Sequence, residues 1–355
     1  MSENAREIQT VTGPVPVDRL GVVLPHEHLF NDLSAVVSEP GHPLADLPVS
    51  PSDAWRLRRD PYCSRDNLGG KALEDVLREI DVFRAVGGAT IVDVTPSAAI
   101  GRDPVRLRRA AELSGVTVVM GCGSYFEKFE AGHAGRSVDV QGAAIDDELT
   151  HGDPRHHVRP GIIGEIGVSP AFTQGEQVSL RAAALAQLNH PRVPLMIHLP
   201  GWRRLGHAVL DVVVDEIGVA ADRVVLAHMD PSGTDPAYQV SLADRGVWLE
   251  FDMIGMDITF PGEGTAPSAE VTADVVSALI WRGYGTQLLL SHDLFLKQMW
   301  TRNGGNGLAF VPAVFTSMLL ARGVEAATSA SILRRNPARM LSGNTSAPSR
   351  GGVTT

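Results

Sequence analysis

Short runs of apolar, mostly β-branched residues recur along the chain. Eight of them stand out, at residues 22–24, 90–94, 116–120, 162–163, 194–197, 224–226, 247–251 and 288–290. Their apolar character is nearly continuous and does not alternate with polar residues, which is typical of parallel strands covered on both faces. The pattern therefore predicts eight buried strands.

Most gaps between these runs carry the spacing of an amphipathic helix. Apolar positions 73, 76, 77, 80 and 83 follow the i, i+3, i+4, i+7 rule before a Gly-Gly pair, and positions 205–213 repeat it before Gly218. Eight alternating units predict an α/β protein, a (β/α)8 TIM barrel with its active site at the C-terminal ends of the strands. We expect one such domain over residues 1–341 and a flexible tail over residues 342–355.

A doubly wound open sheet is the alternative architecture. Such a sheet binds its ligand at one switch point, and its nucleotide-binding forms carry a Gly-x-Gly-x-x-Gly turn after a strand. No predicted strand is followed by that turn, and the polar residues at strand ends are spread along the whole series. The sequence therefore favours the barrel.

Three stretches do not fit the strand and helix unit. They are the long connections at residues 31–67, 125–160 and 255–268, which are rich in Pro, Gly or both. All three leave from C-terminal strand ends, where barrel enzymes place the loops that shape the substrate site. We expect these connections to do the same, and we expect the first residues of the chain to be mobile.

Composition narrows the class of protein. No apolar stretch approaches the ~20 residues that span a bilayer, and the first residues lack the layout of a secretory signal, so we expect a cytoplasmic protein that does not enter membranes. Cys63 and Cys122 are the only cysteines, and we interpret both as reduced thiols. The formal charge of −10 argues against nucleic acid as a partner but says little about the substrate, which we expect to be a small molecule.

Polar residues with metal-binding groups stand near the ends of five predicted strands. They are His26, His28, Glu165, His198, His228 and Asp293. A lone histidine at a strand end is more often a hydrogen-bonded structural residue, but in a barrel all six groups converge on one mouth. Because unpaired carboxylates buried there would be costly, a divalent ion is favoured. His292 neighbours Asp293 and should face the opposite way, and the other histidines lie in predicted loops or helices.

These residues lie within motifs that resemble those of the phosphotriesterase family of the amidohydrolase superfamily. The motifs are Leu24-Pro-His-Glu-His-Leu29, Thr95-Pro-Ser-Ala-Ala-Ile-Gly-Arg102, Ile163-Gly-Glu-Ile-Gly167, Ile197-His198, Ala227-His228 and Leu290-Ser-His-Asp293. The resemblance covers about residues 13–341. It implies that His26, His28 and Asp293 bind one divalent metal, that His198 and His228 bind a second, and that Glu165 bridges the two.

The chain departs from the best-known members of the family at the bridge. Those members use a carboxylated lysine on the fourth strand, where this chain has Glu165. The only lysines, Lys71, Lys128 and Lys297, lie outside every predicted strand, so a carbamate bridge is excluded. The resemblance is therefore closer to the Glu-bridged branch, which includes the phosphotriesterase homology proteins and phosphotriesterase-related proteins.

The mechanism that this resemblance implies is hydrolysis by a binuclear metal centre with a metal-bridging hydroxide. Asp293 would be both a metal ligand and the acid/base group. Tyr125 resembles the tyrosine that lactonases of the family place beside the metals, and its alternative role is that of an amphipathic loop anchor. The two ions are expected to be Zn, with Mn, Co or Fe as alternatives. The family further implies a homodimer.

The resemblance specifies the bond that is cleaved less tightly than it specifies the metal ligands. The branch points first to a carboxyl-derived bond, in a lactone, ester or amide, and second to phosphotriester hydrolysis as a side activity. The polar, Gly-rich connection at residues 295–310 argues against acyl-homoserine lactones, because lactonases that use them carry a long apolar loop there. A different class is a silent barrel that serves as a binding protein, which the presence of all six ligands disfavours.

Overall fold

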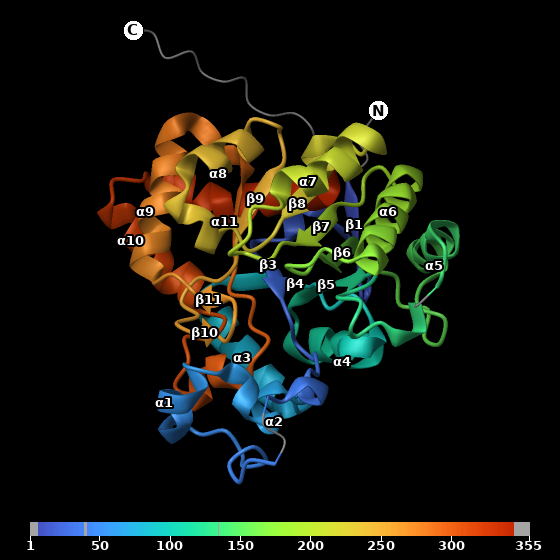
Figure 1. Cartoon of the computed structure of the whole chain (residues 1–355). Coiled ribbons are helices and arrows are strands. Elements are labelled where there is room, and N and C mark those ends of the chain that lie inside the picture. Colours follow the sequence, from blue (N-terminus) through green and yellow to red (C-terminus); the bar gives the residue numbers. More distant parts are fainter. Residues whose placement is uncertain (1–5, 39–40, 134, 344–355) are drawn as a thin grey trace, which may run out of the picture.

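In the computed structural model, which describes residues 6–38, 41–133 and 135–343, the eight apolar runs form one eight-stranded sheet. Its parallel strands are β3 (Val22–Glu27), β4 (Gly88–Asp93), β5 (Thr117–Cys122), β6 (Ile162–Gly167), β7 (Leu195–His198), β8 (Val224–Leu226), β9 (Trp248–Phe251) and β12 (Leu288–Leu290). Each strand pairs with the next, and the edge strands β3 and β12 contact each other, which closes the barrel (Figure 1). The barrel prediction is confirmed.

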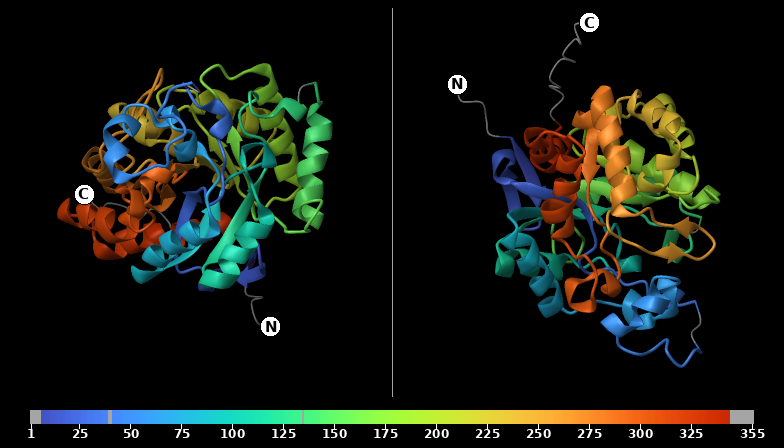
Figure 2. Two further views of the ribbon diagram at one scale, coloured as in Figure 1. Left: turned by 90° about the horizontal axis from the view of Figure 1, so that it is seen from below. Right: turned by 90° about the vertical axis from the view of Figure 1, so that its left-hand side faces the viewer.

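Helices surround the barrel, as Figure 2 shows from two further directions. The main ones are α3 (Leu73–Ala85), α4 (Pro104–Ser114), α5 (Val138–His151), α6 (Gln174–Asn189), α7 (Gly206–Leu210), α8 (Pro236–Ala243), α9 (Ala269–Leu279), α10 (Thr316–Ala321) and α11 (Ala326–Ser342). Several begin with a side chain that caps the first turn, such as Asp103 before α4 and Thr173 before α6. Such caps satisfy N–H groups that have no partner inside the helix.

Two apolar clusters account for the continuous hydrophobic runs. Residues on one face of the strands fill the barrel interior, and they include Val23, Val92, Val119, Met196, Val225 and Leu289. Their neighbours in sequence face outward and pack against the helices, and they include Leu24, Ile91, Val118, Ile197, Leu226 and Leu290. Both faces of each strand are therefore buried, which explains why polar residues do not alternate along them.

A hairpin of β1 (Glu7–Thr10) and β2 (Gly13–Pro16), which we did not predict, closes the end of the barrel where the strands begin. Ile8 belongs to the interior cluster together with Met340 and Leu341 of α11. The N–H of Val11 donates to the carbonyl oxygen of Val118 at 3.0 Å, which ties the turn of the hairpin to β5.

The three long connections gather at the opposite end of the barrel. The first holds the short helices α1 (Ala54–Leu57) and α2 (Arg65–Leu68), and the third holds a small hairpin of β10 (Thr259–Phe260) and β11 (Gly264–Thr265). The N–H of Thr259 donates to the carbonyl oxygen of Arg58 at 2.8 Å, so these two connections touch. Our reading of residues 125–160 as one irregular connection was wrong, because they contain α5, which packs on α6. Its apolar face is small, which weakened the periodic pattern.

The flexibility predicted for the first residues and the tail falls mainly on residues 1–5 and 344–355, outside the described part of the chain, and Ser342 ends α11. Both cysteines are free. None of the described helices combines the length and the apolar character needed to cross a bilayer.

Candidate metal centre

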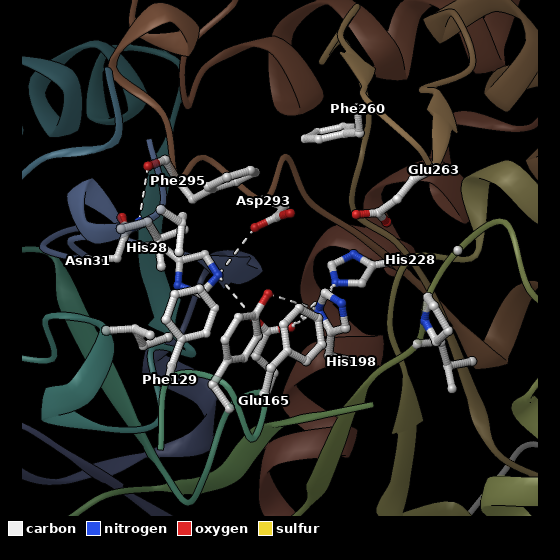
Figure 3. A pocket seen from close by; sticks show the side chains of 18 of the residues that line it. His28, Asn31, Phe129, Glu165, His198, His228, Phe260, Glu263, Asp293 and Phe295 are labelled. Atoms are coloured by element: carbon white, nitrogen blue, oxygen red, sulfur yellow. Dashed lines mark hydrogen bonds and ion pairs between the residues drawn. The ribbon is translucent and has the colours of Figure 1, made fainter. Parts of the chain in front are cut away.

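The structure brings all six predicted ligands together at the end of the barrel where the strands finish. Figure 3 labels all of them except His26. His26 and Glu165 lie within β3 and β6, and His198 ends β7. The other three follow a strand directly or within three residues: His28 after β3, His228 after β8 and Asp293 after β12. Residues far apart in sequence therefore form one buried cluster.

Glu165 lies at the middle of this cluster. Its Oε1 is 3.3 Å from Nε2 of His28, and its Oε2 is 3.5 Å from Nε2 of His26. The same Oε2 is 3.0 Å from Nδ1 of His198 and 3.4 Å from Nε2 of His228. Three groups of the described residues have the geometry of a metal site, and two of them share this glutamate: His26 with His28 and Glu165, and Glu165 with His198 and His228. The third is His26 with His228 and Asp252.

Asp293 adds a second carboxylate beside the first of these groups. Its Oδ1 is 3.2 Å from Nε2 of His28 and 3.7 Å from Nε2 of His26. Asp293 and His228 both have a positive φ, of 50° and 59°, which non-glycine residues adopt only at a cost of about 1–3 kcal/mol. Such strain is retained mainly at functional sites.

Bulges in β3 and β6 direct two of the side chains into the mouth. Between Leu24 and Glu27, β3 advances three residues while β4 advances two, and β6 does the same against β7 between Ile163 and Ile166. An extra residue in one strand reverses the alternation of side chains beyond it. Leu24 and Ile163 therefore face outward, whereas His26 and Glu165, two residues further along, face the mouth.

The ring nitrogens that face away from the cluster have hydrogen-bond partners of their own. Nδ1 of His28 lies 2.8 Å from the Thr95 hydroxyl oxygen. Nδ1 of His26 lies 3.0 Å from Oε2 of Glu250, and Nδ1 of His228 lies 2.8 Å from Oδ1 of Asp252. Partners of this kind fix the orientation of histidine ligands and raise their basicity.

Sequence reasoning missed Glu250 and Asp252. The available signal was an acidic residue inside an apolar run and another immediately after it, at the end of β9. Asp252 also approaches His26, with 3.3 Å between Oδ2 and Nδ1, so it contacts one histidine of each three-residue group. Both carboxylates are fully buried.

The carboxylates of the cluster favour positive charge at His26 and His28. Burial lowers the pKa of His28, but the Asp293 and Glu165 carboxylates raise it more, to about 9. Burial also lowers the pKa of His26, and Asp252, Glu165 and Glu250 raise it to about 10. Burial raises the pKa of Glu165, and the surrounding histidines bring it well below its usual range.

A divalent ion fits this donor set. Nε2 of His26 is buried and has no hydrogen-bond partner among the described residues, although two carboxylates lie within 4 Å of it. A cation beside that nitrogen would satisfy its lone pair and neutralise the carboxylates. Mixed imidazole and carboxylate ligands suit Zn and also Mn, Co or Fe.

A cavity of about 840 Å³, including the space open to solvent, lies over the cluster. Its walls are largely aromatic and aliphatic. The aromatic residues come from all three long connections, from the segment after β7 and from the segment after β12: Tyr62, Tyr125, Phe126, Phe129, Trp202, Phe260 and Phe295. The hydroxyl of Tyr125 is 3.5 Å from Nδ1 of His198. Burial, together with the Glu165 and Asp293 carboxylates, raises the pKa of Tyr125 well above its usual value, so its hydroxyl remains a donor.

His292 faces away from the centre, as its position next to Asp293 predicted. Its Nδ1 is 2.7 Å from Oε1 of Glu27, and its Nε2 accepts a hydrogen bond from the N–H of Val311 at 2.9 Å. Glu27 lies between His26 and His28, and it likewise points away from the cluster. The two side chains connect β3 to the segment after β12.

A sequence model of the phosphotriesterase family matches residues 6–341. The chain is 32% identical over 349 residues to an N-acetyltaurine hydrolase of Danio rerio, an alignment that covers 96% of this chain and 99% of that protein.

Two solved structures extend the comparison to the fold. A resiniferatoxin-binding protein from Rhodobacter sphaeroides is 44% identical, with a TM-score of 0.91 and 96% of both chains covered. A mutant of a PTE-like lactonase from Deinococcus radiodurans is 26% identical, with a TM-score of 0.74 over 94% of this chain and 99% of that one.

Proposed function

Because the chain belongs to the phosphotriesterase family and is a hydrolase of that family, we propose that it cleaves a carboxyl-derived bond with the help of two divalent metal ions. The amide bond of an N-acyl compound is the first candidate, and esters and lactones follow. The observation that carries the proposal is the position of Glu165 between two groups of histidines, each within reach of one ion.

Six side chains would hold the ions. His26, His28 and Asp293 would hold one, His198 and His228 the other, and Glu165 would contact both. Two bound ions lower the pKa of a water molecule towards neutrality and polarise the carbonyl group of a substrate. The carboxylates of Glu165 and Asp293 and the histidines with their partners provide the rigid, charged support that this chemistry needs.

The protein's own groups handle the proton. Water adds to the carbonyl carbon, the C–N or C–O bond breaks, and the leaving group takes the proton that the water has lost. Asp293 faces the centre and is placed to accept that proton and pass it on. The Tyr125 hydroxyl, beside His198, is placed to donate a hydrogen bond to the substrate oxygen that becomes negative.

The similarity to proteins named N-acetyltaurine hydrolase supports an N-acyl substrate, because it extends over 96% of this chain. The aromatic walls of the cavity support an organic substrate with apolar surface. Phosphotriester hydrolysis is a side activity in this proposal and weaker than acyl hydrolysis. The site can accept a phosphotriester because its tetrahedral phosphorus resembles the transition state of acyl transfer.

Metal analysis combined with a hydrolysis screen tests the proposal. We expect about two ions per chain after incubation with zinc or manganese, and faster hydrolysis of N-acyl amides, aryl esters or lactones than of paraoxon-like triesters. Glu165→Ala should lose metal and turnover together, whereas Glu216→Ala, which alters an exposed glutamate, should lose neither. Well under one ion per chain would contradict the proposal and support a binding protein, and faster cleavage of triesters would overturn the choice of bond.

A further inference from the structure

The rim of the cavity carries two charged side chains that the proposed chemistry does not use. Lys128 is the one lysine or arginine among the described residues that line the cavity. Glu263 is the one lining carboxylate, within the same described set, that does not belong to the metal cluster. Lys128 lies in the connection after β5, and Glu263 lies in the β10–β11 hairpin.

Aromatic rings hold Lys128 close to the centre. Its Nζ lies 5.0 Å from the ring centroid of Phe129 and 5.6 Å from that of Phe126. The ring of Phe126 in turn meets the ring of His198 edge-on, with 4.7 Å between centroids. One aromatic ring therefore separates the ammonium group from a side chain of the metal cluster.

The charge of Lys128 is not neutralised within the described chain. Its ammonium makes cation–π contacts, and no carboxylate of the described residues lies within ion-pair distance of it. Cation–π contacts orient a lysine without cancelling its charge. The group is consequently free to pair with an anion that enters the cavity.

Glu263 places the opposite charge on another wall. Its carboxylate is directed towards the space between Asp293 and His228 (Figure 3). The N–H of Glu263 donates to the carbonyl oxygen of Phe260 at 3.1 Å, which fixes the turn that carries it. Phe260 contacts the rings of Tyr62, Trp202 and Phe295, so this wall is apolar apart from its acidic residue.

We propose that Lys128 selects substrates that carry an acidic group and that Glu263 orients them by repelling that group. This inference rests on the proposed function and names its substrate class, N-acyl amides or esters whose leaving group bears a carboxylate or sulfonate. Lys128 binds the acidic group on the Phe126 and Phe129 side. Glu263 repels that group from the hairpin wall, so the apolar acyl group lies against Phe260 and its neighbours.

Steady-state kinetics with a matched pair of substrates tests the proposal. The pair is an N-acyl amino acid and the N-acyl alkylamine of the same acyl group and length, which lacks the acid. For Lys128→Gln we expect KM for the acidic substrate to rise roughly fivefold to tenfold, with kcat little changed and the neutral substrate unaffected. Lys128→Arg should retain the preference, and Lys128→Glu should reverse it. Glu263→Gln should lower KM for the acidic substrate.

Salt and a distant variant provide the controls. In the unmodified enzyme, kcat/KM for the acidic substrate should fall as ionic strength rises, and Lys128→Gln should remove that dependence. Arg109→Gln removes one positive charge from an exposed position on α4 and should change neither substrate.

Two results would overturn the proposal. One is equal KM values for the two substrates in the unmodified enzyme, and the other is an equal rise in both KM values for Lys128→Gln. If neither substrate is hydrolysed with any metal, the proposed function fails instead. Calorimetric binding of the two compounds to the metal-loaded protein then decides the role of Lys128 separately, and equal affinities would reject it.

Discussion

At the scale of single residues, Asp293 is fixed both by its backbone and by its side chain. It follows β12 with a positive φ, its Oδ1 approaches both histidines of β3, and its N–H donates to the carbonyl oxygen of His26 at 3.2 Å. Backbone and side chain are thus held from the same neighbouring strand. A group held this firmly can both contact a metal and exchange a proton in a defined direction.

Asp293→Asn separates these two roles. The amide keeps one oxygen that can contact a metal but loses the ability to take a proton, so we expect much of the metal to remain while kcat falls at least about 100-fold. Metal content and kcat should be measured together. Asp211→Asn, at an exposed ion pair with Arg245, is the control and should leave both values unchanged. Near-normal turnover in Asp293→Asn would reject its acid/base role.

Lys71 is a second residue whose surroundings have a measurable consequence. Its side chain is fully buried, and Nζ donates to the Asn31 side chain and to the Phe295 carbonyl oxygen, the latter at 2.9 Å. Burial lowers the pKa of Lys71 from 10.5 to about 7. The unfolded chain therefore binds this proton more readily than the folded chain between those two pH values.

The folded state should accordingly gain stability from Lys71 as the pH rises from about 7 towards 10.5. Lys71→Met removes that contribution, so the difference in unfolding free energy between the two proteins should change by on the order of 1 kcal/mol per pH unit in this window. Urea unfolding of both proteins at pH 7.5 and 9.5, at constant metal concentration, measures it. A difference that does not vary with pH would contradict a neutralised Lys71.

Single residues also show how far the sequence could predict the site. His26, His28, Glu165, His198, His228 and Asp293 could be selected because each is a metal-binding type near the end of an apolar run. Glu250 and Asp252 could not be assigned a role, because their partners, His26 and His228, come from other strands. Lys128 and Glu263 could not be selected from the sequence, because only the folded chain places them on the wall of the cavity.

At the scale of elements, strands with two buried faces were easier to predict than the details of their paths. Apolar runs gave all eight strands, but the bulges in β3 and β6 depend on pairing with β4 and β7, which the sequence of one strand does not contain. Helix α5 was not predicted because it packs mainly on another helix and has only a few buried positions. The β1–β2 hairpin was not predicted because neither of its strands is a continuous apolar run, and only Ile8 and Thr10 of the two strands are buried.

The junction of β3 and β12 depends on one buried carboxylate. Oε1 of Glu27 accepts hydrogen bonds from the Ser291 hydroxyl at 2.8 Å and the His292 N–H at 3.1 Å, and Oε2 accepts one from the Leu294 N–H at 2.9 Å. This carboxylate therefore fixes the segment that carries Asp293 against the strand that carries the histidine pair.

Glu27→Gln should weaken that junction. The NH₂ group of the glutamine would face N–H donors where the glutamate has an acceptor oxygen. We therefore expect a loss of about 2–4 kcal/mol in unfolding free energy. Metal affinity should also fall, although Glu27 itself does not face the centre. Denaturant unfolding and metal titration measure the two effects. Glu74→Gln on the exposed side of α3 is the control, and equal stability of the two variants would rule out this role.

At the scale of the whole molecule, the six ligand candidates come from five strands on different sides of the barrel: β3, β6, β7, β8 and β12. Ions held between them would connect those strands at one end of the barrel. Because the unfolded chain lacks the assembled site, metal binding should stabilise the entire fold.

Removal of metal should therefore lower Tm as well as activity. With two ions at about 100 times their Kd, chelation should lower Tm by roughly 5–10 °C, and added zinc should restore it. Differential scanning calorimetry before and after dialysis against a chelator measures the shift. The Glu165→Ala variant should show a much smaller one, and an equal shift in both proteins would assign the effect to ions bound elsewhere.

The β1–β2 hairpin and the end of α11 meet in the cluster inside the barrel, at the end opposite the cavity. An affinity tag or a chemical tether attached through either of these elements would thus lie on the side of the protein opposite the cavity. Immobilised on a solid support in this way, the protein would present its aromatic entrance to the passing solution, and attachment should interfere little with the arrival of substrate.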